Sequence, residues 1–256
     1  MMCTWADYFS KFFYYFFVPF KFPAHFARII RLTFSQRSLV RELIRLKAHH
    51  RWFASRKFKT IMDVGANTGP FAFAMRLLQP YAQIYAFEPL PHCYHTLVDN
   101  LSPLGEFAAF QTALGNQEGE VEMWESDFSE SSSLLPMDDL HKSTFPHTAN
   151  THSVKVPISK LDFFLSQMDL KPPVLLKLDV QGYELRVLEG AVKTLSHVDW
   201  IITEMSFKPL YQNQALFDDV YQWLLKHRFK FAGIMDSLIS PLDGSFLQAD
   251  GMFFRR

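Results

Sequence analysis

The chain has 256 residues, 48% of them hydrophobic, which suits one large domain or one domain with an appendage. Cys3 and Cys93 are its only cysteines, so a disulfide framework and a metal-ligand spacing of cysteines are excluded, and a reducing compartment is expected. The formal net charge is zero, yet residues 1–60 carry 12 basic and 2 acidic side chains and the remainder carries 14 and 24, which gives +10 against −10.

The first twenty residues are unusually aromatic, and positions 5, 9, 12, 13, 16, 17 and 20 share one helical stripe. The apolar run between Lys11 and Lys21 is too short to span a bilayer, and no signal-peptide cleavage site is present. Residues 5–34 therefore have two open interpretations: packing on this chain or on a homodimer mate, and peripheral contact with a membrane. We expect a cytoplasmic protein, either free or peripheral on the inner face of the membrane.

Residues 36–53 predict a second helix with an apolar face of Leu39, Leu43 and Leu46. Arginines recur every fourth residue on another face, a pattern typical of a solvated surface and less often of anionic contact. The basic excess fits either an anionic partner or docking on the acidic remainder. We assign residues 1–55 to an aromatic and basic helical extension and residues 56–256 to the main domain.

From residue 58 onward, buried strands alternate with helices, which predicts an α/β fold with a doubly wound, mostly parallel sheet. Residues 125–152 show no period and predict a long functional or disordered loop. The last two strands flank Asp243-Gly244 and predict an antiparallel hairpin. Strands are predicted at 58–64, 82–87, 107–114, 120–124, 154–158, 174–179, 200–204, 229–235 and 246–254, and helices at 70–78, 90–102, 161–168, 182–195 and 214–227.

The stretch Thr60–Pro70 organises the candidate site. It reads as a buried strand, a turn with two glycines, and a helix that opens at Pro70. Such a loop lets a ligand approach bare backbone N–H groups. Glu88 ends the next strand about 20 residues further on, where an acidic residue binds two ribose hydroxyls in nucleoside-binding folds. The pattern therefore predicts a nucleoside ligand.

The loop departs from the dinucleotide-binding fingerprint because Pro70 stands where the last glycine belongs. Its spacing, Asp63-x-Gly65-x-Asn67-x-Gly69, resembles the first motif of class I S-adenosylmethionine (SAM) methyltransferases. Asn67 replaces a frequent glycine, and asparagine tolerates left-handed backbone angles. An NAD-type oxidoreductase is disfavoured by Pro70 and by the terminal hairpin, because the methyltransferase version of the Rossmann-like fold inserts an antiparallel last strand.

Two further motifs extend the resemblance: Phe87-Glu88-Pro89, and Lys177-Leu178-Asp179-Val180-Gln181-Gly182-Tyr183-Glu184. With the first loop, they resemble the FkbM family of SAM-dependent methyltransferases over about residues 58–256. The resemblance implies O-methylation of a hydroxyl, often on a sugar of a glycan or glycolipid or on a secondary metabolite. It implies that SAM is the cofactor, that Glu88 binds its ribose and that Asp179 lies beside the methyl group. It places Asp63, Gly65, Asn67 and Gly69 in the SAM loop.

Methyl transfer to a neutral hydroxyl needs a base or a metal ion near the acceptor oxygen. Asp179 and Glu204 end neighbouring strands at the sheet edge where ligands bind, so one could act as base while the other orients the acceptor. The pair could instead hold a divalent cation. In the competing interpretations, Asp179 is a helix N-cap and Glu204 bonds to backbone N–H groups. His152, in the polar 125–152 stretch, is an alternative base.

A SAM-fold binding or scaffold protein without catalysis is the second class of function. Intact Asp63, Glu88 and Asp179 argue against it. The expected partner is a small-molecule or glycan acceptor. No nucleic acid is expected, because no interleaved basic and aromatic pattern points to specific readout.

Overall fold

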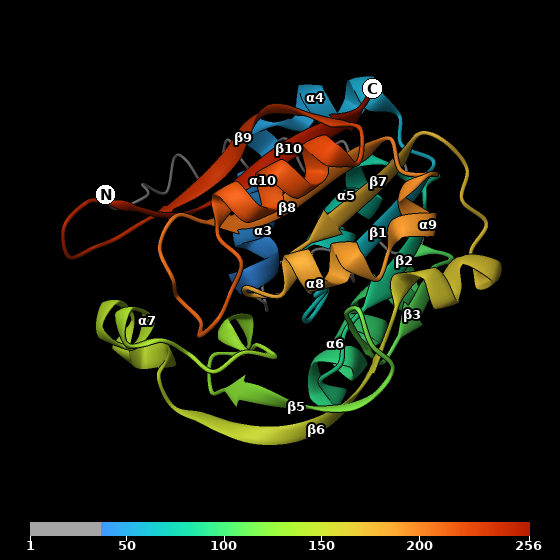
Figure 1. Cartoon of the computed structure of the whole chain (residues 1–256). Coiled ribbons are helices and arrows are strands. Elements are labelled where there is room, and N and C mark those ends of the chain that lie inside the picture. The colour runs from blue at the N-terminus through green and yellow to red at the C-terminus, as the bar shows by residue number, and fades with distance from the viewer. Residues whose placement is uncertain (1–36) are drawn as a thin grey trace, which may run out of the picture.

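The computed structural model describes residues 37–256, so the predictions for residues 5–34 lie outside the described part of the chain. The described region folds into a main sheet covered by helices, with a smaller sheet beside it (Figure 1). Within residues 37–256, no helix is both long and apolar enough to cross a bilayer.

The main sheet has seven strands in the order β3-β2-β1-β7-β8-β10-β9. The first five are parallel, and β10 is antiparallel to both β8 and β9. This confirms the predicted doubly wound sheet with an antiparallel last strand and its terminal hairpin. The strand order reverses between β1 and β7, and a ligand crevice is expected at this point. The strands are β1 (Thr60–Val64), β2 (Gln83–Phe87), β3 (Ala108–Phe110), β7 (Val174–Leu178), β8 (Trp200–Ser206), β9 (Phe229–Ile239) and β10 (Phe246–Arg255).

Helices cover both faces of the sheet (Figure 1). One face carries α3 (Arg37–Ala48), α4 (His50–Arg56) and α5 (Pro70–Leu78), and the other carries α8 (Glu184–Glu189), α9 (Val192–Leu195) and α10 (Phe217–Lys226). Successive side chains of a strand point to opposite faces, so Ile61 packs with the first group while Met62 and Val64 pack with the second. The same alternation directs Asp63 to the α3 face.

The smaller sheet has the order β4-β6-β5, from β4 (Ala113–Leu114), β5 (Gly119–Ser126) and β6 (Thr151–Ser159). The prediction of one strand at 107–114 is wrong, because the chain leaves the main sheet after β3 and pairs through β4 with β6. The Thr112 hydroxyl lies between the two strands and donates to the Pro157 carbonyl, 3.2 Å away, which holds the chain in its new direction.

Several predicted segments are divided or better ordered than expected. The 125–152 stretch contains η4 (Ser129–Ser131), α7 (Asp139–Thr144) and η5 (Pro146–Thr148) rather than one loop. The predicted helix 182–195 is divided into α8 and α9 near Gly190, whose backbone packs so closely on Gly115 that a Cβ would overlap it. Residues 161–167 form a 3-10 helix, η6 (Leu161–Gln167), while α6 (Pro91–Leu101) matches its predicted range closely.

The described part of the N-terminal extension is joined to the main domain by packing. Leu39, Leu43 and Leu46 of α3 and Phe53 of α4 belong to the same buried cluster as α5. The predicted helix 36–53 is thus two helices, α3 and α4, with the expected apolar face. The domain division between residues 55 and 56 stays a prediction.

Candidate active site

A cavity of about 760 Å³ opens at the reversal point of the strand order. This volume is within the usual range for small-molecule sites. The first loop, Glu88, the ends of β7 and β8, segment 128–134 and helix α3 all contribute to its lining. Of the residues predicted for the site, the lining includes Gly65, Asn67, Glu88, Asp179 and Glu204, whereas Asp63 and Gly69 are not part of it.

The first loop has the backbone conformation that its sequence suggests. Gly65, Asn67 and Gly69 have φ angles of 75°, 50° and 87°, all in the left-handed region. Glycine is required at position 65, because a Cβ there would overlap the backbone oxygen of Asp179. The loop after β1 and the loop after β7 therefore touch, and they bring the predicted cofactor and catalytic residues together.

The loop N–H groups are not bare, and the expectation that they face a ligand is wrong. Gly65 N and Ala66 N each donate to the Phe87 carbonyl at 3.0 Å, and Gly69 N donates to the Ala66 carbonyl at 2.8 Å. Thr68 N donates to Asn67 Oδ1 at 2.7 Å. The loop folds back on the end of β2. A ligand would therefore contact the surface of the turn and the Asn67 side chain, which line the cavity, rather than free N–H groups.

Glu88 is buried and tied to the loop. Its Oε2 accepts from Asn67 N at 2.8 Å, and its Oε1 accepts from Leu90 N at 2.9 Å. Burial raises the pKa of Glu88 to about 7, although these two N–H groups lower it. Each carboxyl oxygen keeps a second lone pair, so the group can still accept hydrogen bonds from a ligand in the cavity.

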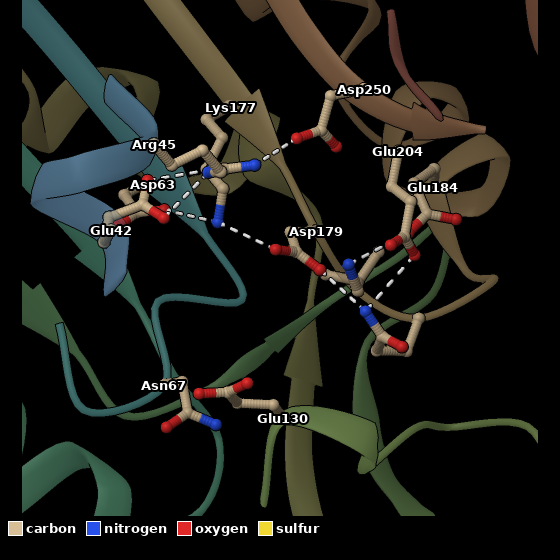
Figure 2. Close-up of polar contacts among 12 residues, drawn as sticks. Glu42, Arg45, Asp63, Asn67, Glu130, Lys177, Asp179, Glu184, Glu204 and Asp250 are labelled. Carbon is tan, nitrogen blue, oxygen red and sulfur yellow. Dashed lines mark hydrogen bonds and ion pairs between the residues drawn. The ribbon is translucent and has the colours of Figure 1, made fainter. Parts of the chain in front are cut away.

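In the cavity wall, Lys177 links two acidic residues (Figure 2). Its Nζ lies 3.4 Å from Asp63 Oδ1 and 3.1 Å from Asp179 Oδ2. Burial alone would lower the pKa of Lys177, but Asp179 and Asp63 outweigh it and hold that pKa above its usual value. Asp63 is fully buried, and its burial raises its pKa in spite of Lys177. Asp63 thus acts on the cavity through Lys177.

Asp179 and Glu204 meet at one amide group, the side chain of Gln181. Gln181 Nε2 donates to Asp179 Oδ1 at 2.8 Å and to Glu204 Oε2 at 3.2 Å. Burial would raise the pKa of Asp179, but Lys177 and the Gln181 bond outweigh it and hold the pKa below its usual value. Burial, and then the charge of Asp179, raise the pKa of Glu204 well above its usual value. Of the two, Asp179 is therefore the more acidic group.

These contacts exclude the two competing interpretations of the carboxyl groups. Helix α8 begins at Glu184, whose own carboxylate accepts from Val180 N at 2.9 Å, so Asp179 is not an N-cap. Glu204 bonds to a side-chain amide and not to backbone N–H groups. The Gln181 amide bridges Asp179 and Glu204. Among residues 37–256, no group of three or more His, Cys, Asp or Glu side chains could hold a metal ion.

Helix α3 forms a second wall of the cavity, which the sequence did not reveal. Arg45 donates to Glu42 at 2.8 and 2.9 Å and pairs with Asp250 of β10 (Figure 2). Arg41 pairs with Glu130 of η4. The predicted solvated arginine face is wrong for Arg45, because Asp250, more than 200 residues away in the chain, covers it.

Only some polar side chains of the 125–152 stretch line the cavity. Ser131, Ser132, His141 and His147 line the cavity, and burial lowers the pKa of His141 to about 4. His152 is exposed, lies 3.4 Å from Glu125 and is not part of the lining. This position gives no support to His152 as the base.

The cavity carries an excess of acidic side chains, and its three cations are paired. Lys177 and Arg45 have the partners described above, and Arg41 has Glu130. The lining holds six acidic side chains, Glu42, Glu88, Glu130, Asp179, Glu204 and Asp236. Burial raises the pKa of Glu88 and of Glu204, but the other four acidic side chains still outnumber the three cations, so the lining favours a ligand that carries positive charge.

A model of the methyltransferase FkbM domain matches residues 63–231. The chain belongs to the FkbM methyltransferase family. The matched segment is a methyltransferase FkbM domain, and the family implies SAM as its cofactor. The match begins at Asp63, so helix α3 and Asp250 lie outside it.

Curated relatives of this FkbM-family enzyme cover only part of its length. The 2-O-methyltransferase NoeI of Sinorhizobium fredii is 29% identical over 160 residues, which are 60% of this chain and 66% of that protein. The hexuronic acid methyltransferase AglP of Haloferax volcanii is 26% identical over 146 residues, 57% and 55% of the two chains. The chain thus spans less than two thirds of either relative.

Among solved structures, the magnesium protoporphyrin IX methyltransferase from Synechocystis PCC 6803 resembles this chain with a TM-score of 0.46 and 12% identity. The similarity covers 84% of this chain and 79% of that one.

Proposed function

We propose that this FkbM-family enzyme transfers a methyl group from SAM to a hydroxyl of a sugar, within a glycan, a glycolipid or a secondary metabolite. The observation that carries the proposal is the Asp179–Glu204 pair, held by one amide on the wall of a cavity that also contains Glu88. The names of two relatives, a 2-O-methyltransferase and a hexuronic acid methyltransferase, support an oxygen acceptor on a sugar.

The loop side of the cavity fits SAM, which would supply a methyl group on a positively charged sulfur. Glu88 would accept from the ribose hydroxyls, and the turn at Gly65 and Asn67 would curve around the nucleoside. Asp63 and Gly69 do not line the cavity and would support the cofactor site indirectly. Asp63 would act through its ion pair with Lys177, and Gly69 would let the turn pack against Leu97. The acidic lining suits the charge of the cofactor.

The carboxyl pair would take the proton that the hydroxyl loses. Asp179 is ionised and is therefore the member able to accept it. Glu204, whose pKa is raised, would hold the hydroxyl in place as a neutral group. Because the two groups share one amide and influence each other's charge, their titration belongs to the pair.

Two measurements test the proposal. Calorimetric titration should show binding of SAM and none of NAD. Labelled methyl transfer should then be detected on at least one member of a panel of neutral and acidic oligosaccharides, and treatment with EDTA followed by Mg²⁺ or Mn²⁺ would reveal whether a divalent metal takes part. Methylation of a nitrogen or carbon acceptor, with no sugar methylated, would overturn the assignment of the acceptor.

For residues 5–34 we retain the proposal of peripheral association, with a membrane or with a homodimer mate. The motive is the aromatic stripe beside the basic excess of residues 1–60. Full-length protein should pellet with anionic vesicles at low salt, and a truncation starting near Arg37 should not. If full-length protein does not pellet with the vesicles, the membrane interpretation is wrong, and packing of residues 5–34 on protein is the remaining interpretation.

A further inference from the structure

Gln181, which the sequence motif contains without a role, contacts both carboxyl groups of the site. It follows the end of β7, lies between Asp179 and the turn into α8, and lines the cavity. Its side-chain amide uses both of its N–H donors and one of the two lone pairs of its oxygen. The two N–H bonds of Nε2 go to Asp179 and Glu204, and Oε1 accepts from the Tyr211 hydroxyl at 2.9 Å.

These partners allow one orientation of the amide. In the opposite orientation, Oε1 would face the carboxyl oxygens of Asp179 and Glu204, and two acceptors at hydrogen-bond distance repel each other. The Tyr211 hydroxyl has one proton and two acceptors in reach, Gln181 Oε1 at 2.9 Å and the Ser131 carbonyl at 3.0 Å, and it supports this orientation when it donates to Oε1. Tyr211 is itself buried and lies within 3.0 Å of the Ser131 carbonyl of η4.

The backbone at Gln181 is held in an unfavourable conformation. Its φ is 53°, in the left-handed region, where residues other than glycine and asparagine pay a conformational cost. The Ser133 hydroxyl donates to the Gln181 carbonyl at 2.6 Å and supports this conformation. This backbone conformation directs the Gln181 side chain back toward Asp179, two residues earlier. The hydrogen bond to Asp179 accounts for the retention of a costly left-handed conformation at this position.

We propose that Gln181 is a positioning residue of the methyl-transfer site, which orients the carboxyl groups of Asp179 and Glu204 through its two N–H bonds, and that Tyr211 fixes the orientation of its amide. The inference rests on the proposed function only in stating that the orientation of the two carboxyl groups serves methyl transfer. The contacts themselves involve residues of this chain alone and can be tested without an acceptor.

Gln181 also affects the proton affinity of the pair. An N–H donor stabilises the ionised form of a carboxyl group, so removing it raises the pKa. Gln181 is one influence among several, because charged groups face the pair from every neighbouring element: Lys177 on β7, Arg45 on α3, Asp63 on β1, Glu184 on α8 and Asp250 on β10 (Figure 2).

Two substitutions of Gln181 and one of Tyr211 separate a positioning role of Gln181 from an effect on folding. Gln181→Asn shortens the side chain so that it no longer spans both carboxyl groups, and asparagine accepts the left-handed backbone more readily than glutamine. Gln181→Glu keeps the length and replaces the donors with acceptors. Tyr211→Phe removes only the hydroxyl that orients the amide. Tyr94→Phe is its matched control, since the Tyr94 hydroxyl donates to the Ala109 carbonyl and neither residue lines the cavity.

The readout is the titration of Asp179 in full-length protein carrying ¹³C-labelled aspartate carboxyl groups, with its signal assigned from the Asp179→Asn spectrum. In Gln181→Asn the Asp179 pKa should rise by about one unit, in Gln181→Glu it should rise further, and in Tyr211→Phe it should rise by less than in either. Tyr94→Phe should leave it unchanged. An Asp179 pKa in Gln181→Asn equal to that of the wild type would overturn the proposal.

Activity adds a second arm once a sugar acceptor is in hand. The acid limb of kcat should move to higher pH in Gln181→Asn by the same amount as the Asp179 pKa, while the SAM dissociation constant stays within about three-fold. A uniform loss at every pH would indicate a merely structural role. If no sugar is methylated, the proposed function fails, and the titration still decides whether Gln181 controls the pair.

Discussion

The two walls of the cavity differ in the contacts that hold them. The loop wall, residues 63–69 with Glu88, is tied by backbone hydrogen bonds to the end of β2 and by close packing on the loop after β7. The α3 wall is attached by the buried packing of its leucines and, on the cavity side, by two ion pairs. These are Arg41–Glu130 and Arg45–Asp250, whose members are 89 and 205 residues apart in the chain. The first wall lies inside the family match and the second outside it.

This difference leads us to expect different consequences from substitutions in the two walls. Backbone hydrogen bonds hold the loop wall in one conformation, and this wall contains the proposed SAM-binding residues. Changes in it should therefore act on cofactor binding. Ion pairs between long side chains are weaker and screened by salt, so changes in the α3 wall should act on stability and access, by smaller amounts.

The largest effect is expected where the walls meet, at Asp179. Asp179→Asn is nearly isosteric and keeps the bond to Gln181 possible, so SAM should still bind, while turnover should fall roughly 100-fold or more through loss of the ionised carboxylate. Glu204→Gln resembles the neutral state of Glu204 and should lose less. Initial rates at saturating SAM measure both. Full activity in Asp179→Asn would remove this residue from the mechanism.

In the loop wall, Glu88→Ala should weaken SAM binding by about 1–3 kcal/mol. The substitution removes the acceptor of Asn67 N and Leu90 N as well as the proposed partner of the ribose hydroxyls. Calorimetry with SAM measures the loss, and denaturation without ligand shows how much of it comes from the loop itself. An unchanged SAM affinity would contradict the assignment of Glu88 to the ribose.

In the α3 wall, Arg45→Met should lower stability at pH 7.5 by about 1–2 kcal/mol, because it leaves Glu42 and Asp250 without their cation. Burial raises the pKa of Asp250 to about 6, against the attraction of Arg45. Below that pH Asp250 is protonated and the pair contributes less, so the difference between variant and wild type should shrink toward pH 5.

Urea denaturation at the two pH values measures this difference, and Arg45→Lys, which keeps the charge, is the control. An equal loss at pH 5 and pH 7.5 would mean that Arg45 acts by packing of its side-chain stem and not by its charge.

The smallest effect is expected for Arg41→Ala. Its side chain is 62% exposed, and exposed ion pairs contribute at most about 1 kcal/mol and less at high salt. The SAM dissociation constant should change by no more than about two-fold, and stability by a few tenths of a kcal/mol. A loss comparable to that of Glu88→Ala would show that the two walls are not as different as their contacts indicate.

Local patterns were sufficient for much of the fold and for the loop wall. The alternation of strands and helices, the terminal hairpin and the left-handed turn each depend on residues close together in the chain, where periodicity and glycine spacing carry the information. The limits of the strand at 107–114 were missed, because its second half pairs with β6, about 45 residues later. A partner at that distance leaves no periodic trace in the strand itself.

By itself, the sequence determined the α/β alternation and the turn at Gly65 and Asn67, because these follow from backbone geometry within short segments. Its motifs, including Glu88, carried the resemblance to the FkbM family. Only the tertiary structure decided that Gln181 joins Asp179 to Glu204, that Lys177 links Asp63 to Asp179 and that α3 closes the cavity through Arg45 and Asp250. Hydrogen bonds and ion pairs of this kind depend on distances between side chains, and those distances exist only once the strands and helices have packed.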